Sequence, residues 1–272
     1  MTPAEFKKAI DNGENVYGTL LTVNSPYWLD ACKKIAPDFL FIDTEHTGHD
    51  IQNLAWMCRG YKEAGITPIV RVPNHDHYSA TVAMDAGATG IIFPYLESVE
   101  EIKELLSIKY RPLKGEKVKQ LIDGKIKLND TMQKYVENYN KNTTFWVNIE
   151  SVRAVNNLDD ILAIPEIDGV FVGPHDFSCQ YEMPEDYHNP EFIELCQNVM
   201  RKARAAGKSA GVHFPWADLT FEKLMMDAGS NFIVHAADIL MFIDTAVEKL
   251  DGLREHGGNS DKMVGKQTQI NI

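Results

Sequence analysis

Two carboxylates in the middle of the chain follow two apolar segments, in a pattern that suits a metal-binding site. Glu150 comes directly after the segment 145–149, and Asp176 follows the segment 169–172. A helical segment separates these two predicted strands, so the strands are expected to run parallel and to end at the same edge of a sheet. Neighbouring strands lie about 5 Å apart, which allows two side chains at their ends to bind one cation.

The same two residues also allow a simpler interpretation. Two bare carboxylates this close repel each other, and a metal ion or a shared proton is the usual resolution. Alternatively, Glu150 caps the next helix and Asp176 closes a turn. These two residues alone do not decide between the alternatives.

Length and composition exclude several classes of protein. The chain has 272 residues, enough for one large α/β barrel or two small domains, and its hydrophobic content of 44% is ordinary for a globular protein. The formal net charge of -12 argues against nucleic acid as a partner. No apolar run approaches the roughly 20 residues that span a membrane, and residues 1–8 contain no apolar signal core. The four cysteines lack metal-finger spacing and are expected to be reduced thiols of a cytoplasmic protein.

Apolar segments alternate with helical segments along most of the chain. Strands are expected at residues 16–22, 39–42, 68–70, 90–94, 145–149, 169–172, 209–212 and 232–234. The helices between them include 51–64, 99–108, 152–164, 192–206 and 219–228. Eight such strands predict a single-domain α/β protein, a (β/α)8 TIM barrel over residues 1–255 with an extra N-terminal helix. Residues 109–142 are the least regular and predict a solvated excursion with a helix at 131–140, and residues 256–272 predict a polar tail.

Titratable side chains gather where the predicted strands end. Active sites of such barrels lie at the carboxyl ends of the strands. The residues expected there are Asp43, Glu45, His46, Arg71, Glu150, Asp176, His213 and His235. A purely structural barrel has no reason to place so many titratable groups on one rim, so this pattern favours an active site over separate capping roles.

Six motifs in a fixed order carry a resemblance to a known family. They are FIDTEH at 41–46, PIVRVP at 68–73, MDAGA at 84–88, IIFP at 91–94, IES at 149–151 and DGVFVGPHDFS at 168–178. In their order and spacing the sequence resembles the HpcH/HpaI aldolases, the metal-dependent (class II) pyruvate aldolases, from about residue 6 to residue 250. This resemblance implies that the chain cleaves a 4-hydroxy-2-oxo acid to pyruvate, or a similar 2-oxo acid, and an aldehyde through a metal-stabilised enolate.

The resemblance implies roles for individual residues. Glu150 and Asp176 would hold a divalent metal, Mg²⁺ or Mn²⁺ by preference, with Co²⁺ or Zn²⁺ as substitutes. Arg71 would stabilise the developing enolate charge, although a structural ion pair is the alternative. His46 would be the general base, with Asp43 nearby and Asp85 of a neighbouring subunit as its partner, although a rim histidine without a catalytic role is the alternative. The resemblance also implies a homo-hexamer, a trimer of dimers, with exchanged C-terminal helices.

Four positions depart from the family pattern. Asn148 replaces the usual Gln, His175 replaces Ala or Ser, and His213 and His235 end the last two strands. The backbone N–H groups around His175 and Asp176 would still receive the pyruvate carboxylate. The added histidines either contact the acceptor aldehyde or pack structurally. Two alternative functions stay open: decarboxylation of oxaloacetate or another enolate condensation, and a catalytically silent barrel that binds a 2-oxo acid.

Overall fold

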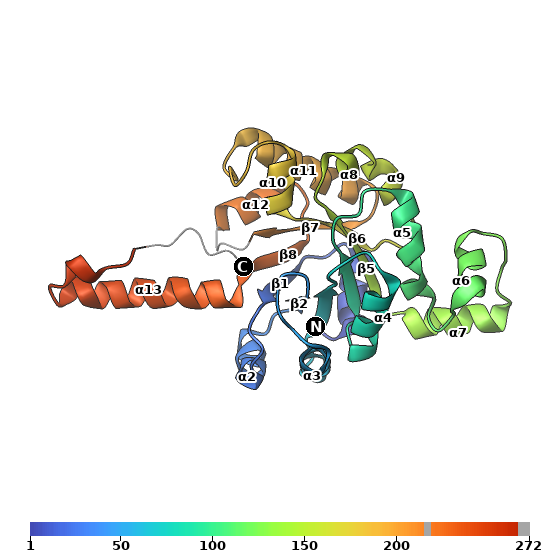
Figure 1. Ribbon diagram of the computed structural model, residues 1–272, viewed down its shortest axis with the longest axis horizontal. Coiled ribbons are helices and arrows are strands. Elements are labelled where there is room, and N and C mark those ends of the chain that lie inside the picture. The colour runs from blue at the N-terminus through green and yellow to red at the C-terminus, as the bar shows by residue number, and fades with distance from the viewer. Residues whose placement is uncertain (215–218, 266–272) are drawn as a thin grey trace.

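Eight parallel strands close into a barrel in sequence order, with β1 and β8 as neighbours (Figure 1). This computed structural model describes residues 1–214 and 219–265. The strands are β1 (Val16–Leu21), β2 (Phe39–Asp43), β3 (Thr67–Arg71), β4 (Gly90–Phe93), β5 (Thr144–Ile149), β6 (Gly169–Val172), β7 (Ser209–Phe214) and β8 (Phe232–Ala237). The predicted (β/α)8 barrel is therefore confirmed.

Helices surround the barrel and fill the connections between strands. They are α1 (Pro3–Asn12), α2 (Pro26–Ile35), α3 (Ile51–Glu63), α4 (His77–Ala86), α5 (Val99–Leu105), α6 (Gly115–Ile122), α7 (Asp130–Asn140), α8 (Val152–Asn156), α9 (Leu158–Leu162), α10 (Pro174–Gln180), α11 (Pro190–Ala205), α12 (Leu219–Asp227) and α13 (Asp238–His256). Short 3₁₀ helices span Leu106–Tyr110 and Ser260–Lys262.

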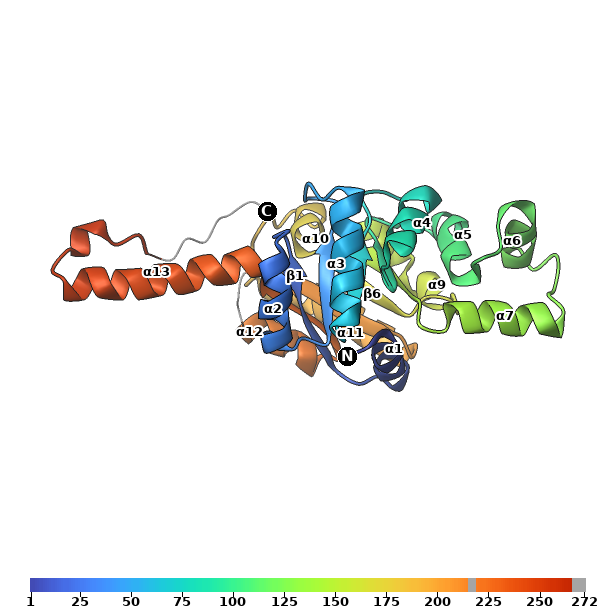
Figure 2. The same cartoon turned by 90° about the horizontal axis from the view of Figure 1, so that it is seen from below.

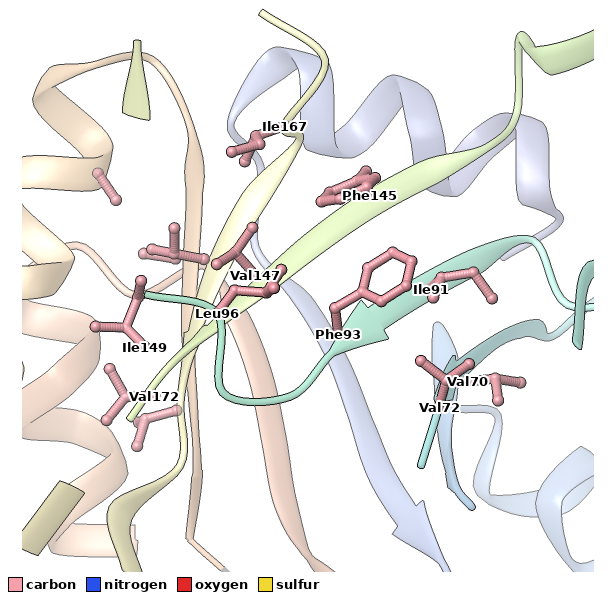
Figure 3. Packing of buried hydrophobic residues seen from close by; sticks show 14 of the residues in the cluster. Val70, Val72, Ile91, Phe93, Leu96, Phe145, Val147, Ile149, Ile167 and Val172 are labelled. Atoms are coloured by element: carbon pink, nitrogen blue, oxygen red, sulfur yellow. The ribbon is translucent and has the colours of Figure 1, made fainter. Parts of the chain in front are cut away.

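Side chains alternate between two apolar layers along each strand, as the period of two in a β-strand requires. Phe39 and Phe41 of β2 belong to the cluster inside the barrel, whereas Leu40 and Ile42 belong to the cluster between the barrel and its helices. Figure 3 shows part of this outer cluster, with side chains of β3 to β6 on the helix-facing side of the sheet. This alternation fixes which residues at the strand ends face inward.

Helix α1 closes the amino-terminal end of the barrel. Thr2 caps it in a capping box with Glu5, and the extra N-terminal helix is present as predicted. The Phe6 ring packs against Phe39 and Phe232, with centroids 5.5 and 6.4 Å apart. With this end plugged by aromatic side chains, the opposite, carboxyl end is where the polar residues gather.

Four segments differ from the sequence prediction. The expected helix 152–164 is divided at Asn157, whose amide donates to the carbonyl of Glu97, and the expected helix 99–108 ends in a 3₁₀ turn. Helices α6 and α10 were not predicted. Helix α6 lies in the supposedly solvated excursion, where Val118 packs with Leu113 and Val136 in a separate small apolar cluster. Together with α7 it extends away from the barrel (Figure 1).

Helix α13 projects from the barrel on the side opposite to α6 and α7 (Figures 1 and 2). Its side chains Phe242 and Leu253 are 60% and 68% exposed, which is unusual for large apolar groups. The residues after it turn back, and Asp251 accepts the backbone N–H groups of Val264 and Gly265. The first part of the predicted polar tail is thus tied to α13, and residues 266–272 lie outside the described part of the chain.

Candidate active site

Three charged residues at the carboxyl ends of β2, β3 and β5 point into the barrel because they continue its inward-facing positions. Asp43 follows Phe39 and Phe41 at intervals of two, Arg71 follows Ile69, and Glu150 follows Trp146 and Asn148. The strand pairing places Asp43 directly beside Arg71. All three side chains are almost fully buried. The structure therefore brings together three of the residues predicted for the site.

Arg71 and Asp43 form a bidentate ion pair. Arg71 Nε donates to Asp43 Oδ1 at 2.8 Å and Nη2 donates to Oδ2 at 2.9 Å, while Glu45 Oε2 lies 3.1 Å from Nε. Burial alone would lower the pKa of Arg71, but the hydrogen bonds and charge of Asp43 outweigh it and raise this pKa. Burial likewise opposes ionisation of Asp43, yet Arg71 keeps its pKa below the usual value. Both groups are charged at neutral pH.

Glu150 accepts one hydrogen bond at each of its two carboxylate oxygens. Asn148 Nδ2 donates to Oε1 at 2.8 Å, and the backbone N–H of Tyr95 donates to Oε2 at 2.9 Å. Burial raises the pKa of Glu150 to about 7, and Asp176 and Glu45 add to this while Arg71 opposes it. Such a carboxylate gains from a cation nearby.

Gly173 leaves the space that Glu150 occupies. A Cβ atom built on Gly173 would lie 1.9 Å from Glu150 Oε1, so any larger residue would displace the carboxylate. The last residue of β5 pairs with Val172, the residue before this glycine. The glycine of the 168–178 motif therefore has a steric role in the site.

Asp176 lies in the first turn of α10, directly beyond β6. It is exposed, and its charge raises the pKa of both Glu150 and Glu45, so it faces the same site from the rim. No side chain caps the N-terminus of α10, which leaves the backbone N–H groups around His175 and Asp176 suited to an anionic group. His175 is itself exposed, with Nδ1 3.7 Å from Glu185 Oε1.

His46 lies at the rim on the turn after β2. Asp43 orders this turn by accepting the backbone N–H groups of Glu45 and His46 at 3.1 and 3.3 Å. The His46 side chain is 51% exposed, and its Nε2 lies 3.7 Å from Glu45 Oε2. Asp43, Glu45, His46 and Arg71 thus form one connected group.

Asp85 is not near this group within one chain. It is the penultimate residue of α4, a helix that leads from the end of β3 back to the start of β4. It therefore lies toward the amino end of the barrel, where its exposed carboxylate pairs with Arg111. The expected contact with His46 through a neighbouring subunit stays a prediction.

The two histidines of the last strands face opposite sides of the barrel wall. The ring of His213 packs edge-on against Phe41, with centroids 5.9 Å apart, and its Nε2 has no hydrogen-bond partner within the described residues. Burial and Arg71 lower the pKa of His213 to about 3, so the ring is neutral. His213 is consistent with the predicted position at the inner wall.

His235, in contrast, points outward. Its Nδ1 lies 2.8 Å from Glu222 Oε1 on α12, and β8 pairs it with Phe214, whose ring stacks on Phe221 of the same helix. The expectation that His235 faces the barrel mouth is therefore wrong. His213 pairs with Val234, so His235 is offset by one residue, which places its side chain on the other face of the sheet.

The residues present fit a divalent cation. Among the described residues there is no group of three or more His, Cys, Asp or Glu side chains arranged to hold a metal. Glu150 and Asp176 offer two carboxylates, a set that suits Mg²⁺, which commonly binds one or two carboxylates and keeps several waters. The raised pKa of Glu150 supports this fit, because the buried charge lacks full compensation from the protein.

Tyr95 and Gly173 are site residues that sequence reasoning missed. The contact of Tyr95 with Glu150 uses the backbone N–H and not the tyrosine side chain. No residue type or spacing signals such a contact. Gly173 stood in a motif, but its role appears only once Glu150 is placed beside it.

Comparisons with known proteins agree on one family. The model of the HpcH/HpaI aldolase/citrate lyase family matches residues 17–245. The 2-keto-3-deoxy-L-rhamnonate aldolase of Escherichia coli (strain K12) is 26% identical over 260 residues, which cover 96% of each chain. The crystal structure of an HpcH/HpaI aldolase from Desulfitobacterium hafniense DCB-2 has a TM-score of 0.79 and 25% identity, and covers 92% of this chain and 96% of that one.

More distant structures share the fold alone. Macrophomate synthase has a TM-score of 0.72 at 24% identity, with 93% of this chain and 90% of that chain covered. No helix within the described residues is long and apolar enough to cross a membrane. The family model covers most of the chain, including every strand end that carries Asp43, Arg71, Glu150 and Asp176. The chain belongs to the HpcH/HpaI aldolase/citrate lyase family.

Proposed function

We propose that the protein is a metal-dependent (class II) aldolase that reversibly cleaves a 4-hydroxy-2-oxo acid to pyruvate, or a similar 2-oxo acid, and an aldehyde. The observation that carries this proposal is the buried Glu150 carboxylate, with Asp176 at the rim beside it and the ion-paired Arg71 nearby. The aldolase activity of the Escherichia coli relative supports the reaction class.

Glu150 and Asp176 would hold the cation, with Mg²⁺ or Mn²⁺ favoured and Co²⁺ or Zn²⁺ as substitutes. When bound, the cation would act as a Lewis acid that draws electron density from the keto group of the 2-oxo acid. Asn148 and the Tyr95 N–H would orient the Glu150 carboxylate for this role. The free N–H groups at the start of α10 would receive the substrate carboxylate.

Arg71 would stabilise the negative charge that develops on the keto oxygen. Its guanidinium has five N–H donors, and Asp43 engages two of them, so the group is fixed in place with donors left for a ligand. A charge fixed before the reaction does not have to reorganise during it.

His46 would take the proton of the substrate hydroxyl as the aldehyde is released. It lies at the rim, is half exposed, and has the Glu45 carboxylate within 3.7 Å to orient its ring. Asp85 of a second copy of the chain would complete this pair. That arrangement requires an oligomer, proposed as a hexamer with exchanged α13 helices, and the apolar exposed face of α13 is consistent with it. The proposed location is the cytoplasm.

Pyruvate release from a panel of 4-hydroxy-2-oxo acids tests the proposal. Purified protein stripped of metal should be inactive, and Mg²⁺ or Mn²⁺ should restore turnover. Release of carbon dioxide from oxaloacetate, without cleavage of any hydroxy-oxo acid, would point to a decarboxylase. Binding of pyruvate without turnover of any of these compounds would indicate a silent binding barrel.

A further inference from the structure

Tyr95 has a backbone conformation that its residue type rarely adopts. Its φ of 50° lies in the left-handed region, which is unfavourable for a residue with a side chain. The residue follows Pro94 in the turn beyond β4, at the carboxyl end of the barrel. Strain of this kind persists only where surrounding contacts hold it, so the contacts of Tyr95 indicate its role.

Two hydrogen bonds leave Tyr95 in different directions. Its backbone N–H donates to Glu150 Oε2 at 2.9 Å, and its phenol oxygen accepts from Gln180 Nε2 at 2.7 Å. The first partner lies at the end of β5 and the second on α10. Tyr95 thus connects two elements that are not adjacent to it in sequence.

Gln180 is placed on the same face of α10 as Asp176. The two residues are four positions apart in a continuous helix, and side chains at this spacing lie one above the other. Helix α10 is seven residues long, and its buried residues Pro174, Phe177 and Ser178 do not include the exposed Asp176 and Gln180. A hydrogen bond from Gln180 is therefore an effective way to fix that face.

Packing does not account for Tyr95. Its side chain is partly exposed, and the charges of Glu97, Asp176 and Glu150 reach it, so the ring stands at the polar mouth of the barrel. A tyrosine that only filled apolar space would be replaceable by phenylalanine without effect. The phenol oxygen is instead the acceptor that α10 uses.

We propose that Tyr95 is a positioning residue that sets the distance between the two cation-binding carboxylates. Its N–H orients Glu150, and its phenol, through Gln180, holds the face of α10 that carries Asp176. This inference rests on the proposed function, because it assumes that Glu150 and Asp176 bind one cation. Tyr95 is not itself a ligand, yet it would determine how tightly Glu150 and Asp176 bind the cation.

Mn²⁺ binding to the metal-free full-length protein, measured by isothermal titration calorimetry, tests this role. Tyr95→Phe removes the phenol oxygen but keeps the backbone N–H. It should raise the Mn²⁺ dissociation constant about tenfold, the lower end of the effect of losing outer contacts at metal sites, because the phenol acts on Asp176 only through Gln180. Gln180→Ala should have the same effect, and the double variant should be no weaker than either single variant, since all three break one link.

A matched control separates this role from general effects of losing a hydroxyl. Tyr135→Phe on α7, a half-exposed tyrosine far along the chain, should leave the Mn²⁺ dissociation constant unchanged. The melting temperature of metal-free Tyr95→Phe should match that of the parent protein, while its increase on adding Mn²⁺ should shrink. Gln180→Ala, at an exposed position, provides the same test if Tyr95→Phe folds poorly.

The outcomes distinguish this inference from the function on which it rests. If the parent protein binds Mn²⁺ and Tyr95→Phe binds it within twofold as tightly, the positioning role is wrong and the proposed function stands. A lower metal-free melting temperature with unchanged Mn²⁺ affinity would also overturn it, because that pattern indicates a structural role. If the parent protein binds no divalent metal, both the proposed function and this inference fail.

Discussion

Arg71 and Asp43 are joined by two parallel hydrogen bonds of 2.8 and 2.9 Å, between side chains that the strand register already places side by side. Both groups are buried, and each is the main charged partner of the other. The pair therefore fixes a guanidinium at the carboxyl end of the barrel. The sequence left a structural ion pair and a catalytic charge as alternatives for Arg71, and the ion pair seen here is compatible with the catalytic role proposed above.

Removing Arg71 should abolish both stages of the proposed reaction. Arg71→Ala should lower aldol cleavage and proton exchange at the pyruvate methyl group together, by about a hundredfold or more, because both pass through the same developing charge. NMR in deuterated water measures the exchange. Near-normal exchange in this variant would contradict the assigned role.

A second variant controls for loss of folding. Arg71→Ala leaves Asp43 buried without its partner, which typically destabilises a protein by about 3–5 kcal/mol. Arg71→Lys keeps a positive charge but not the fork that matches a carboxylate. It should remain folded by circular dichroism and still lose most of the exchange activity.

Removal of the metal should abolish activity, and the affinity for the metal should depend on pH. A proton competes with the cation for Glu150, whose pKa is raised to about 7. The Mn²⁺ dissociation constant should therefore increase as pH falls below about 7, approaching tenfold per pH unit, as calorimetry at several pH values would measure. Glu150→Gln should bind Mn²⁺ weakly at every pH. Undiminished turnover by exhaustively demetallated protein would refute the metal requirement.

The same pKa predicts an opposite effect on the metal-free protein. Folding raises the pKa of Glu150 from its ordinary value of 4.5, so the folded state binds more protons between that value and about 7. The contribution of this group to the free energy of unfolding thus falls as pH rises through this window. Metal-free protein should melt at a higher temperature near pH 5.5 than near pH 7.5, and Glu150→Gln should reduce the difference.

The sequence predicted those site residues whose strand position alone decides where they point. Asp43, Arg71 and Glu150 end strongly apolar segments, so the barrel had to bring them to one end. The sequence did not predict the direction of the His235 side chain, because a shift of one residue in register moves a side chain to the other face of the sheet. The register is set by the pairing of β7 with β8, and the local sequence around His235 does not show this pairing.

Contacts between distant segments explain the remaining differences. Helix α6 is only eight residues long, and its Val118 is buried against Val136 of α7, which follows much later in the chain. Tyr95 contributes a backbone N–H, which every residue except proline has. Neither feature can be recognised before the chain is folded.

Helix α13 should mediate assembly. Its large apolar side chains Phe242, Leu250 and Leu253 are all about half exposed or more in the single chain. Light scattering should report an oligomer, with a hexamer expected. Charged replacements at Phe242 and Leu253 should yield smaller species with reduced activity, because Asp85 of a neighbour would no longer reach His46. A fully active monomer would refute this prediction.

His235 should make stability, and not catalysis, depend on pH. Its hydrogen bond with Glu222 raises its pKa, against the effect of burial. The pair should stabilise the fold fully below the unfolded pKa of about 6.5, and this contribution should be lost as pH rises through the folded pKa. His235→Gln should lower the melting temperature more at pH 6 than at pH 8. Because His235 faces α12, the KM of the His235→Gln variant for substrate should equal that of the parent protein.

His213, like His175, remains a histidine predicted to contact the acceptor aldehyde. It lies at the inner wall against Phe41, and its low pKa keeps it neutral beside Arg71. Pyruvate does not require it, since Arg71, the cation and the α10 amides account for the pyruvate oxygens in the proposed site. His213→Leu should therefore raise KM for the hydroxy-oxo acid several-fold to tenfold, as expected for loss of one hydrogen bond.

The comparison of two activities decides the role of His213. Proton exchange at the pyruvate methyl group should be nearly unchanged in His213→Leu, while cleavage of the full substrate weakens. His235→Leu, one residue of register away and facing outward, is the matched control and should alter neither KM nor exchange. Equal losses of exchange and cleavage in His213→Leu would place His213 in the catalytic core or in folding. No loss in either activity would show that this ring only packs against Phe41, and the acceptor side of the site would then have to be formed by other residues.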